Sequence, residues 1–280
     1  MKPIDGRAIA ATLRAENEAA AAALRARGTV PTLAIVVPTQ DEATLWYVRS
    51  LTNAAKRVGV ECRVEELSGP TGADVRRRLE ELSDDPAVHG VMCQTPLPEG
   101  ASLQEAGAYI APDKDVDGAG PTSLGRLVAG LPTFAPATAT AVMEILERSD
   151  VPLRGARAVV VGRSIVVGKP AALLLTAAHA TVTVCHSRTV DLPAVCREAD
   201  VLVVAIGRAK MVGADYVKPG AVVVDVGTNP TPDGGLAGDV DADALADIDG
   251  AVTPVPGGVG PVTTAVLLRN TVQAAAAAAR

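Results

Sequence analysis

The stretch ARAVVVGRSIVVGKPAALLLTAAHA, residues 156–180, contains the strongest structural signal in the chain. Its first part, 156–162, is an apolar run that ends in glycine and predicts a buried strand. A helix is expected to begin at its Gly-Lys-Pro and to continue to about His179. The turn between them is the place where a doubly wound α/β domain holds a phosphate-bearing ligand. Backbone N–H groups and the positive end of the helix dipole point into such a turn.

The same alternation of strand and helix extends in both directions from this stretch. Strands are predicted at 32–37, 60–67 and 89–94 in the first half and at 181–186, 201–206 and 221–227 in the second. Helical patterns separate them, so a parallel sheet covered by helices is expected in each half. We expect an N-terminal α/β domain of residues 1–133 with the C-terminal helix 264–280, and a Rossmann-like doubly wound domain of residues 134–263.

The composition narrows the class of protein. The chain has 280 residues, 48% of them hydrophobic but only 2% aromatic, so the core is expected to be Ala, Val and Leu. The net charge of -6 argues against a nucleic-acid partner, because no basic stripe is available for phosphates. No uncharged apolar run approaches the ~18 residues of a membrane span, and MKPIDGRAIAATLRAE lacks the apolar core of a signal peptide.

Cys62, Cys93, Cys185 and Cys196 form no CxxC pair. Buried reduced thiols in a reducing cytosol are the expectation. The composition and the cysteines together predict a soluble, cytoplasmic protein; no metal is expected.

The nucleotide turn favours NADP over NAD. Its glycines, Gly162 and Gly168, follow G-x5-G rather than GxGxxG, and many strand–glycine–helix turns bind nothing. The next strand is more informative, because it runs into Ser187 and Arg188 where an NAD site usually has an acid. A hydroxyl and a guanidinium suit a 2′-phosphate, and Arg163 in the turn could reach the same region.

Three other stretches also suggest a site. QTPLP (94–98) places an amide at the C-terminal end of a strand, PDKDVDG (112–118) gathers three acids in a loop, and TPVPGGVGPVT (253–263) is rich in proline and glycine. Each has a structural alternative: a strand cap, a solvated or Ca²⁺-like loop, and a plain turn.

Together with YVRS (47–50), GRL (125–127), KPGAVVVDVGTN (218–229) and GDVD (238–241), these motifs resemble the bifunctional methylenetetrahydrofolate dehydrogenase/methenyltetrahydrofolate cyclohydrolase family over essentially the whole chain. The resemblance implies NADP-linked oxidation of 5,10-methylenetetrahydrofolate, with the folate in the cleft between the domains, and a homodimer paired through the second domain. It implies that Tyr47 lines the folate and that Gln94 and Asp117 sit in its pocket, with Asp117 at the pterin edge; these three are the catalytic candidates. The other substrate candidates are Pro96, Leu97, Pro256, Gly257 and Gly258. The cofactor candidates are Thr138, Gly162, Arg163, Ser164, Val167, Gly168, Ser187, Arg188, Gly207 and Thr228.

The chain departs from the family pattern at its central acid/base group. Where the family has a lysine one turn after the tyrosine, this chain has Leu51. Lys56 is rotated to the opposite helix face from Tyr47, and no substitute base is visible in the sequence. Hydride transfer is mainly a positioning problem, whereas hydrolysis of the methenyl cation needs an acid/base group whose loss costs ~10²–10⁴-fold. We therefore expect a dehydrogenase with weak or absent cyclohydrolase activity.

Three alternatives stay open. The chain could be fully bifunctional with an unrecognised substitute base. It could act on another one-carbon or pterin-like substrate, since the changes cluster in the pocket while the cofactor turn is intact. It could also bind folate and NADP without catalysis, although the retained Tyr47, Gln94 and Asp117 speak against this.

Overall fold

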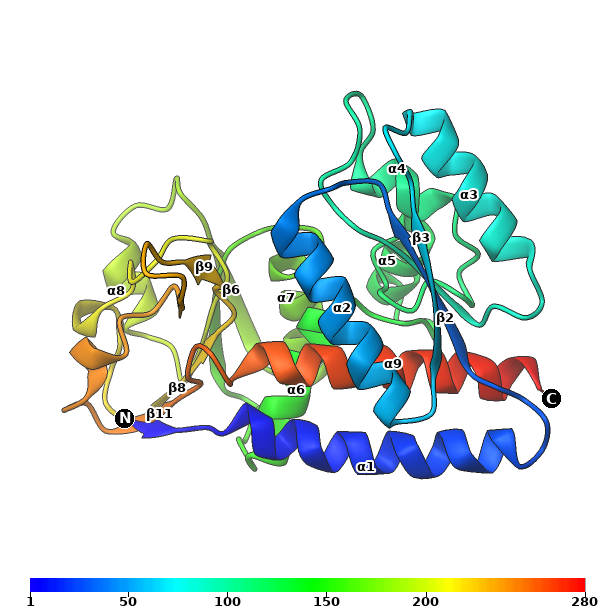
Figure 1. Ribbon diagram of the computed structural model, residues 1–280. Helices are drawn as coiled ribbons and strands as arrows, with labels where there is room; N and C mark the ends of the chain where they lie inside the picture. The colour runs from blue at the N-terminus through cyan, green and yellow to red at the C-terminus, as the bar shows by residue number, and fades with distance from the viewer. Residues whose placement is uncertain (280) are drawn as a thin grey trace. The chain divides into compact units, whose positions relative to one another are not determined.

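The computed structural model describes residues 1–279, and the chain divides into two compact units (Figure 1). The six-stranded unit consists of residues 1–11 and 138–263, and the three-stranded unit of residues 12–137 and the chain from Thr264 on. Both units alternate strands and helices around a parallel sheet, so the predicted two-domain α/β fold is confirmed.

The six-stranded unit is a parallel sheet in the order β1-β11-β8-β7-β5-β6. Its strands are β1 (Lys2–Pro3), β5 (Arg157–Val161), β6 (Thr181–Cys185), β7 (Val201–Val204), β8 (Ala221–Asp225) and β11 (Gly250–Val252). Its other elements are α6 (Ala137–Arg148), α7 (Gly168–Ala177), α8 (Leu192–Cys196), the 3₁₀ turns η1 (Ala214–Tyr216) and η2 (Asp243–Leu245), and the hairpin of β9 (Asn229–Pro230) and β10 (Leu236–Ala237). Strand β7 is buried throughout, whereas β6 is an edge strand with exposed residues.

The N-terminal residues differ from the expected domain boundary. Residues 1–133 were expected in one domain, but β1 pairs in parallel with β11 through Lys2 and Ala251, and residues 1–11 therefore belong to the six-stranded unit. Neither strand was predicted from the sequence, because two or three residues are too few to show a period of two.

The three-stranded unit has the strand order β3 (Glu61–Glu66), β2 (Thr32–Val37) and β4 (Gly90–Cys93), all parallel. Its helices are α1 (Gly6–Arg25), which begins in the other unit, α2 (Glu42–Arg57), α3 (Gly72–Asp84), α4 (Leu103–Ala108), α5 (Pro121–Val128) and α9 (Val259–Ala278). Strand β2 is fully buried because helices cover both faces; Ala34 and Val36 pack in one cluster with Leu79 of α3. Figure 1 shows α2 and α3 on opposite sides of β2 and β3.

Two buried amides join distant segments of the three-stranded unit. The Asn17 Nδ2 donates to the Ala265 carbonyl at 2.8 Å, which ties α1 to α9. The Asn270 Nδ2 donates to the Val116 carbonyl at 2.8 Å, which ties α9 to the loop before α5. Both side chains are buried, so these bonds satisfy groups that would otherwise be costly to desolvate.

All four cysteines are free thiols. Cys185 and Cys196 are buried as predicted, but Cys62 and Cys93 are only partly buried. Burial raises the pKa of the Cys196 thiol to about 12. Within residues 1–279, no helix is long and apolar enough to cross a membrane, and no group of His, Cys, Asp and Glu side chains is arranged to hold a metal ion.

Candidate active site

The two glycines of the turn after β5 pack directly against backbone carbonyl groups, which leaves no room for a side chain. A Cβ atom on Gly162 would overlap the Ala205 carbonyl, and one on Gly168 would overlap the Gly162 carbonyl. Gly162 also has a φ of 132°, which other residues rarely adopt. The Ser164 Oγ accepts hydrogen bonds from the backbone N–H groups of Val167 at 3.2 Å and Gly168 at 3.4 Å. The serine thus satisfies donors at the start of α7.

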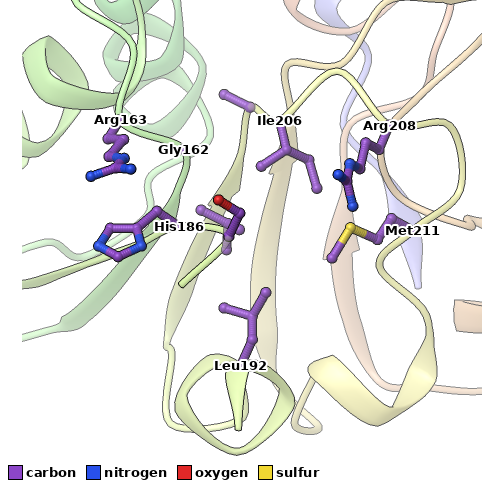
Figure 2. Close-up of a pocket in the computed structure, with 10 residues that line it drawn as sticks. Gly162, Arg163, His186, Leu192, Ile206, Arg208 and Met211 are labelled. Atoms are coloured by element: carbon purple, nitrogen blue, oxygen red, sulfur yellow. The ribbon is translucent and has the colours of Figure 1, made fainter. Parts of the chain in front are cut away.

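A pocket of about 320 Å³ lies at the C-terminal ends of β5, β6 and β7. Of the predicted cofactor residues, Gly162, Arg163 and Ser187 line it. Figure 2 shows Arg163 and His186 on one side of this pocket and Arg208 and Met211 on the other. Neither arginine forms an ion pair with any residue in 1–279. Two unpaired guanidinium groups in one pocket suit a ligand with phosphate groups.

The turn after β6 explains which of its residues face the pocket. The His186 N–H donates to the Thr189 Oγ1 at 2.9 Å, and the His186 Nδ1 accepts from the Arg188 N–H at 3.1 Å. The ring therefore carries its proton on Nε2. Ser187 lines the pocket, whereas Arg188 is exposed and does not. His186 also lines the pocket, although only its neighbours Ser187 and Arg188 were predicted to do so.

The loop after β7 contributes further pocket residues that were not predicted from the sequence, among them Ile206, Arg208 and Met211. Gly207, a predicted cofactor residue, lies in this loop with a φ of 67° but does not line the pocket. Three successive N–H groups of this loop donate to the Asp239 carboxylate, which is fully buried. That carboxylate is 31 residues or more from the loop, so local sequence gave no signal of the contact.

The remaining predicted cofactor residues do not line this pocket. Thr138 is in the first turn of α6, Val167 precedes α7, and Thr228 is exposed beyond β8. The Pro-Gly loop lies elsewhere in the six-stranded unit. In it Pro256 is exposed, and Gly257 and Gly258 are buried. A Cβ atom on Gly6 would overlap the Gly258 carbonyl, so this loop packs closely on the start of α1.

In the three-stranded unit the structure brings Tyr47 and Asp117 together. Tyr47 is half-buried on α2, and burial, followed by the negative charge of Asp117, raises the pKa of its hydroxyl. Gln94 is buried at the end of β4, and its N–H donates to the Val36 carbonyl at 2.9 Å. The Thr44 Oγ1 donates to the Thr95 carbonyl at 2.8 Å, which ties α2 to the loop that follows Gln94.

The flanking residues of that loop are less distinctive. Pro96 is exposed, and Leu97 packs against the core cluster that includes Leu79. Leu97 thus has a structural role in addition to the substrate contact that the resemblance implies.

The three acids of the 112–118 loop have three different environments. Asp113 is exposed. Asp115 is buried, and its carboxylate accepts from the Gly120 N–H at 2.9 Å at the start of α5. The Asp117 carboxylate accepts no hydrogen bond and no ion pair from residues 1–279, and burial, followed by the charge of Asp115, raises its pKa to about 7. The loop is therefore not uniformly solvated.

Leu51 is a core residue in this structure. Its side chain is 1% exposed, one turn beyond Tyr47 on α2, whereas Lys56 is exposed. No lysine or arginine is ion-paired with Asp117 among the described residues. The cluster thus offers a tyrosine, an amide and an unpaired carboxylate, with no cationic acid/base group next to the tyrosine on α2.

The fold and these two groups of residues define an α/β protein with a dinucleotide pocket in one unit and a polar cluster in the other. The comparisons with known proteins identify the class more closely. Residues 136–279 match the tetrahydrofolate dehydrogenase/cyclohydrolase NAD(P)-binding domain, and residues 4–117 match the catalytic domain of the same family. The chain belongs to the tetrahydrofolate dehydrogenase/cyclohydrolase family.

Relatives of known sequence and structure cover nearly the whole chain. It is 59% identical over 275 residues to the bifunctional protein FolD of Parafrankia sp. (strain EAN1pec), covering 98% of this chain and 99% of that protein. The crystal structure of the bifunctional enzyme FolD from Campylobacter jejuni is 37% identical with a TM-score of 0.96, covering 99% of each chain. The Trypanosoma brucei FolD, solved in complex with NADP cofactor and inhibitor, is 36% identical with a TM-score of 0.93, covering 99% of this chain and 98% of that one.

Proposed function

We propose that the chain is an NADP-dependent methylenetetrahydrofolate dehydrogenase that oxidises 5,10-methylenetetrahydrofolate to 5,10-methenyltetrahydrofolate. We propose further that its cyclohydrolase activity, which forms 10-formyltetrahydrofolate, is weak or absent. Two observations carry the second part. Leu51 is 1% exposed at the position where the resemblance leads us to expect a lysine, and Asp117 has no cationic partner among residues 1–279.

The preference for NADP is supported by the six-stranded unit. The tight Gly162–Gly168 turn fits a close approach of phosphate to backbone, and Arg163, Ser187 and Arg208 offer donors to a further phosphate. The Trypanosoma brucei relative was solved with NADP. When bound, NADP supplies the hydride acceptor; the chain's own residues bind and orient it and exclude water.

The two reactions require different groups from the three-stranded unit. Oxidation requires the substrate to be held in place, which Tyr47, Gln94 and Asp117 do in this proposal. Hydrolysis of the methenyl product requires a group that activates water and protonates a ring nitrogen. A buried leucine can do neither, so substitution at position 51 weakens the hydrolysis more than the oxidation.

A second candidate is the full bifunctional enzyme with Asp117 as the substitute base. One observation favours it: a carboxyl with a pKa of about 7 is present in both protonation states near neutral pH, which general acid–base catalysis requires. The names of the relatives point the same way, since the Parafrankia and Campylobacter proteins are both called bifunctional.

A product analysis tests the proposal. Purified protein is incubated with 5,10-methylenetetrahydrofolate and NADP, and NADPH, methenyl- and 10-formyltetrahydrofolate are followed against a control without enzyme. NADPH formation with ring opening at the control rate is the expected result. Accelerated formyl product that disappears in Asp117→Asn would establish the bifunctional alternative. If no NADPH forms, the remaining explanations are that the enzyme acts on a different substrate or that the protein binds folate and NADP without catalysis.

Restoring the lysine sharpens the test. Leu51→Lys is expected to raise the cyclohydrolase rate about 10²-fold with little change in hydride transfer, because it returns the acid/base group alone. Leu51→Met is the matched control, since it keeps a long apolar side chain and is expected to leave both rates unchanged.

We also propose a cytoplasmic homodimer paired through the six-stranded unit. Strand β6 supports this pairing, because within residues 1–279 it pairs only with β5 and its Val184 side chain is exposed. An edge strand of this kind presents unpaired N–H and C=O groups to a partner.

A further inference from the structure

The most fully bonded side chain near the cofactor pocket belongs to Asp239, which the reaction does not use. Its Oδ2 accepts from the N–H groups of Ile206 at 2.7 Å and Gly207 at 3.0 Å. Its Oδ1 accepts from the Arg208 N–H at 2.7 Å and from the Asn229 Nδ2 at 2.9 Å. The carboxylate has no solvent exposure. Four donors converging on one buried carboxylate fix the backbone that supplies them.

Asp239 is itself held by a second aspartate, Asp225. The Asp225 Oδ1 accepts from the Asp239 N–H at 3.0 Å, and its Oδ2 accepts from the Val240 N–H at 2.9 Å. The two motifs interlock through glycines. A Cβ atom on Gly227 would overlap the Asp239 side chain, and one on Gly238 would overlap the Asp225 carboxylate. The DVG and GDVD segments therefore form one rigid support.

The loop on this support carries a pocket residue. The backbone continues along the same segment, because the Lys210 N–H donates to the Gly238 carbonyl at 2.9 Å and the Val212 N–H to the Asp239 carbonyl at 3.0 Å. The Arg208 N–H makes the last of the three bonds to the carboxylate, and the bonds of Lys210 and Val212 follow it along the chain. Its guanidinium lies in the pocket opposite Arg163 and has no ion-pair partner in residues 1–279 (Figure 2).

We propose that Asp239 is a positioning residue for the cofactor: its carboxylate fixes the backbone of residues 206–208 and so holds the Arg208 guanidinium in the pocket, where it binds a phosphate of the dinucleotide. This inference rests on the NADP-linked function proposed above. It adds a second guanidinium to the pocket, one that comes from the loop after β7 rather than from the glycine turn. It also gives the GDVD motif a role in affinity for the cofactor.

A double-mutant cycle on the full chain tests the proposal. Dissociation constants for NADP and NAD are measured by isothermal titration calorimetry for the wild type, Asp239→Asn, Arg208→Gln and the double variant. Each single variant is expected to weaken NADP binding about tenfold, because a charge-assisted bond is lost or misplaced. The double variant is expected to bind within about twofold of Asp239→Asn, because both changes remove the same contact.

The two dinucleotides identify the phosphate. If Arg208→Gln weakens the binding of NADP but not that of NAD, Arg208 contacts the 2′-phosphate. If it weakens the binding of both equally, Arg208 contacts the pyrophosphate. Asp243→Asn is the matched control, an exposed aspartate in the same segment that contacts Lys210 and not the loop of residues 206–208. Its affinity is expected to equal that of the wild type.

Several results would overturn the inference. Additive losses would show that Asp239 acts on general stability rather than through Arg208, and unchanged binding by Arg208→Gln would remove the phosphate contact. If Asp239→Asn does not fold, Gly207→Ala replaces it, because it strains the loop backbone at a positive φ and leaves the carboxylate in place. The loss of NADP affinity in Gly207→Ala must also be non-additive with the loss in Arg208→Gln. A wild type that binds no NADP would instead refute the proposed function.

Discussion

The hydrogen-bonding environments of Asp225 and Asp239 in the six-stranded unit are the opposite of that of Asp117 in the three-stranded unit. In the six-stranded unit, Asp239 accepts four hydrogen bonds and Asp225 accepts three. In the three-stranded unit, the Asp117 carboxylate accepts none from residues 1–279. Burial raises the pKa of Asp225 to about 6 even with its donors, and that of Asp117 to about 7 without any.

This difference distinguishes carboxylates that hold the backbone in place from one that does not. A buried polar group without a partner costs free energy, so a fold retains one only where something else depends on it. The bonded pair, Asp225 and Asp239, stabilises a loop. Asp117, next to Tyr47, has no such supporting role, and a carboxylate with a raised pKa and no hydrogen-bond donor is typical of a functional site.

The largest expected effect is on the interlocked pair. Gly238→Ala places a Cβ atom on the Asp225 carboxylate, and we expect it to lower the free energy of unfolding by about 3 kcal/mol. Urea denaturation followed by circular dichroism measures this. Gly125→Ala is the control, because nothing lies within 4 Å of a Cβ atom there and α5 gains helix propensity. Equal stability of both variants would show that the pair is loosely packed and would remove the contrast.

A smaller effect, with a defined pH dependence, is expected at Asp117. Because its folded pKa is about 7 and its ordinary value 3.8, the folded state binds this proton more tightly than the unfolded state. The stability it contributes is therefore complete below about pH 4 and is lost as the pH rises to 7. Asp117→Asn cannot ionise, so its free energy of unfolding at pH 8 is expected to exceed that of the wild type by about 2 kcal/mol. This is less than the full linkage value, because Asp117 is only partly buried.

The measurement compares thermal unfolding of the two proteins from pH 4 to pH 8. At pH 4 position 117 is neutral in the folded state of both proteins, so that point is the internal control. A constant difference across the range would show that Asp117 is stabilised by a partner after all, and the contrast between the units would fail.

Much of the architecture was predictable because it is encoded locally. Strands β2, β5 and β7 are continuous apolar runs, and glycine turns follow buried strands at Gly162 and Gly207, so periodicity and turn chemistry were sufficient. The short strands β1 and β11 lack such signals. They form because two distant segments pair, and residues 1–11 consequently join the six-stranded unit.

The candidate site was predictable only in part, for the same reason. Arg163 and Ser187 stand in turns next to strands and were found. Arg208 was not, because its position depends on a carboxylate in a distant segment, at Asp239. The raised pKa of Asp117 likewise depends on burial and on its distance from Asp115, neither of which a sequence states.

The smallest expected effect concerns the edge of the sheet in the six-stranded unit. It tests whether strand β6 pairs with a second copy of the chain. Val184→Lys puts a charge on the exposed edge strand β6, and we expect it to weaken dimerisation about tenfold in sedimentation equilibrium, since lysine on an edge disfavours strand pairing. Val190→Lys makes the same change at a more exposed residue beyond the strand and is expected to leave the dimer intact. A wild type that sediments as a monomer would show that the edge is protected without a partner.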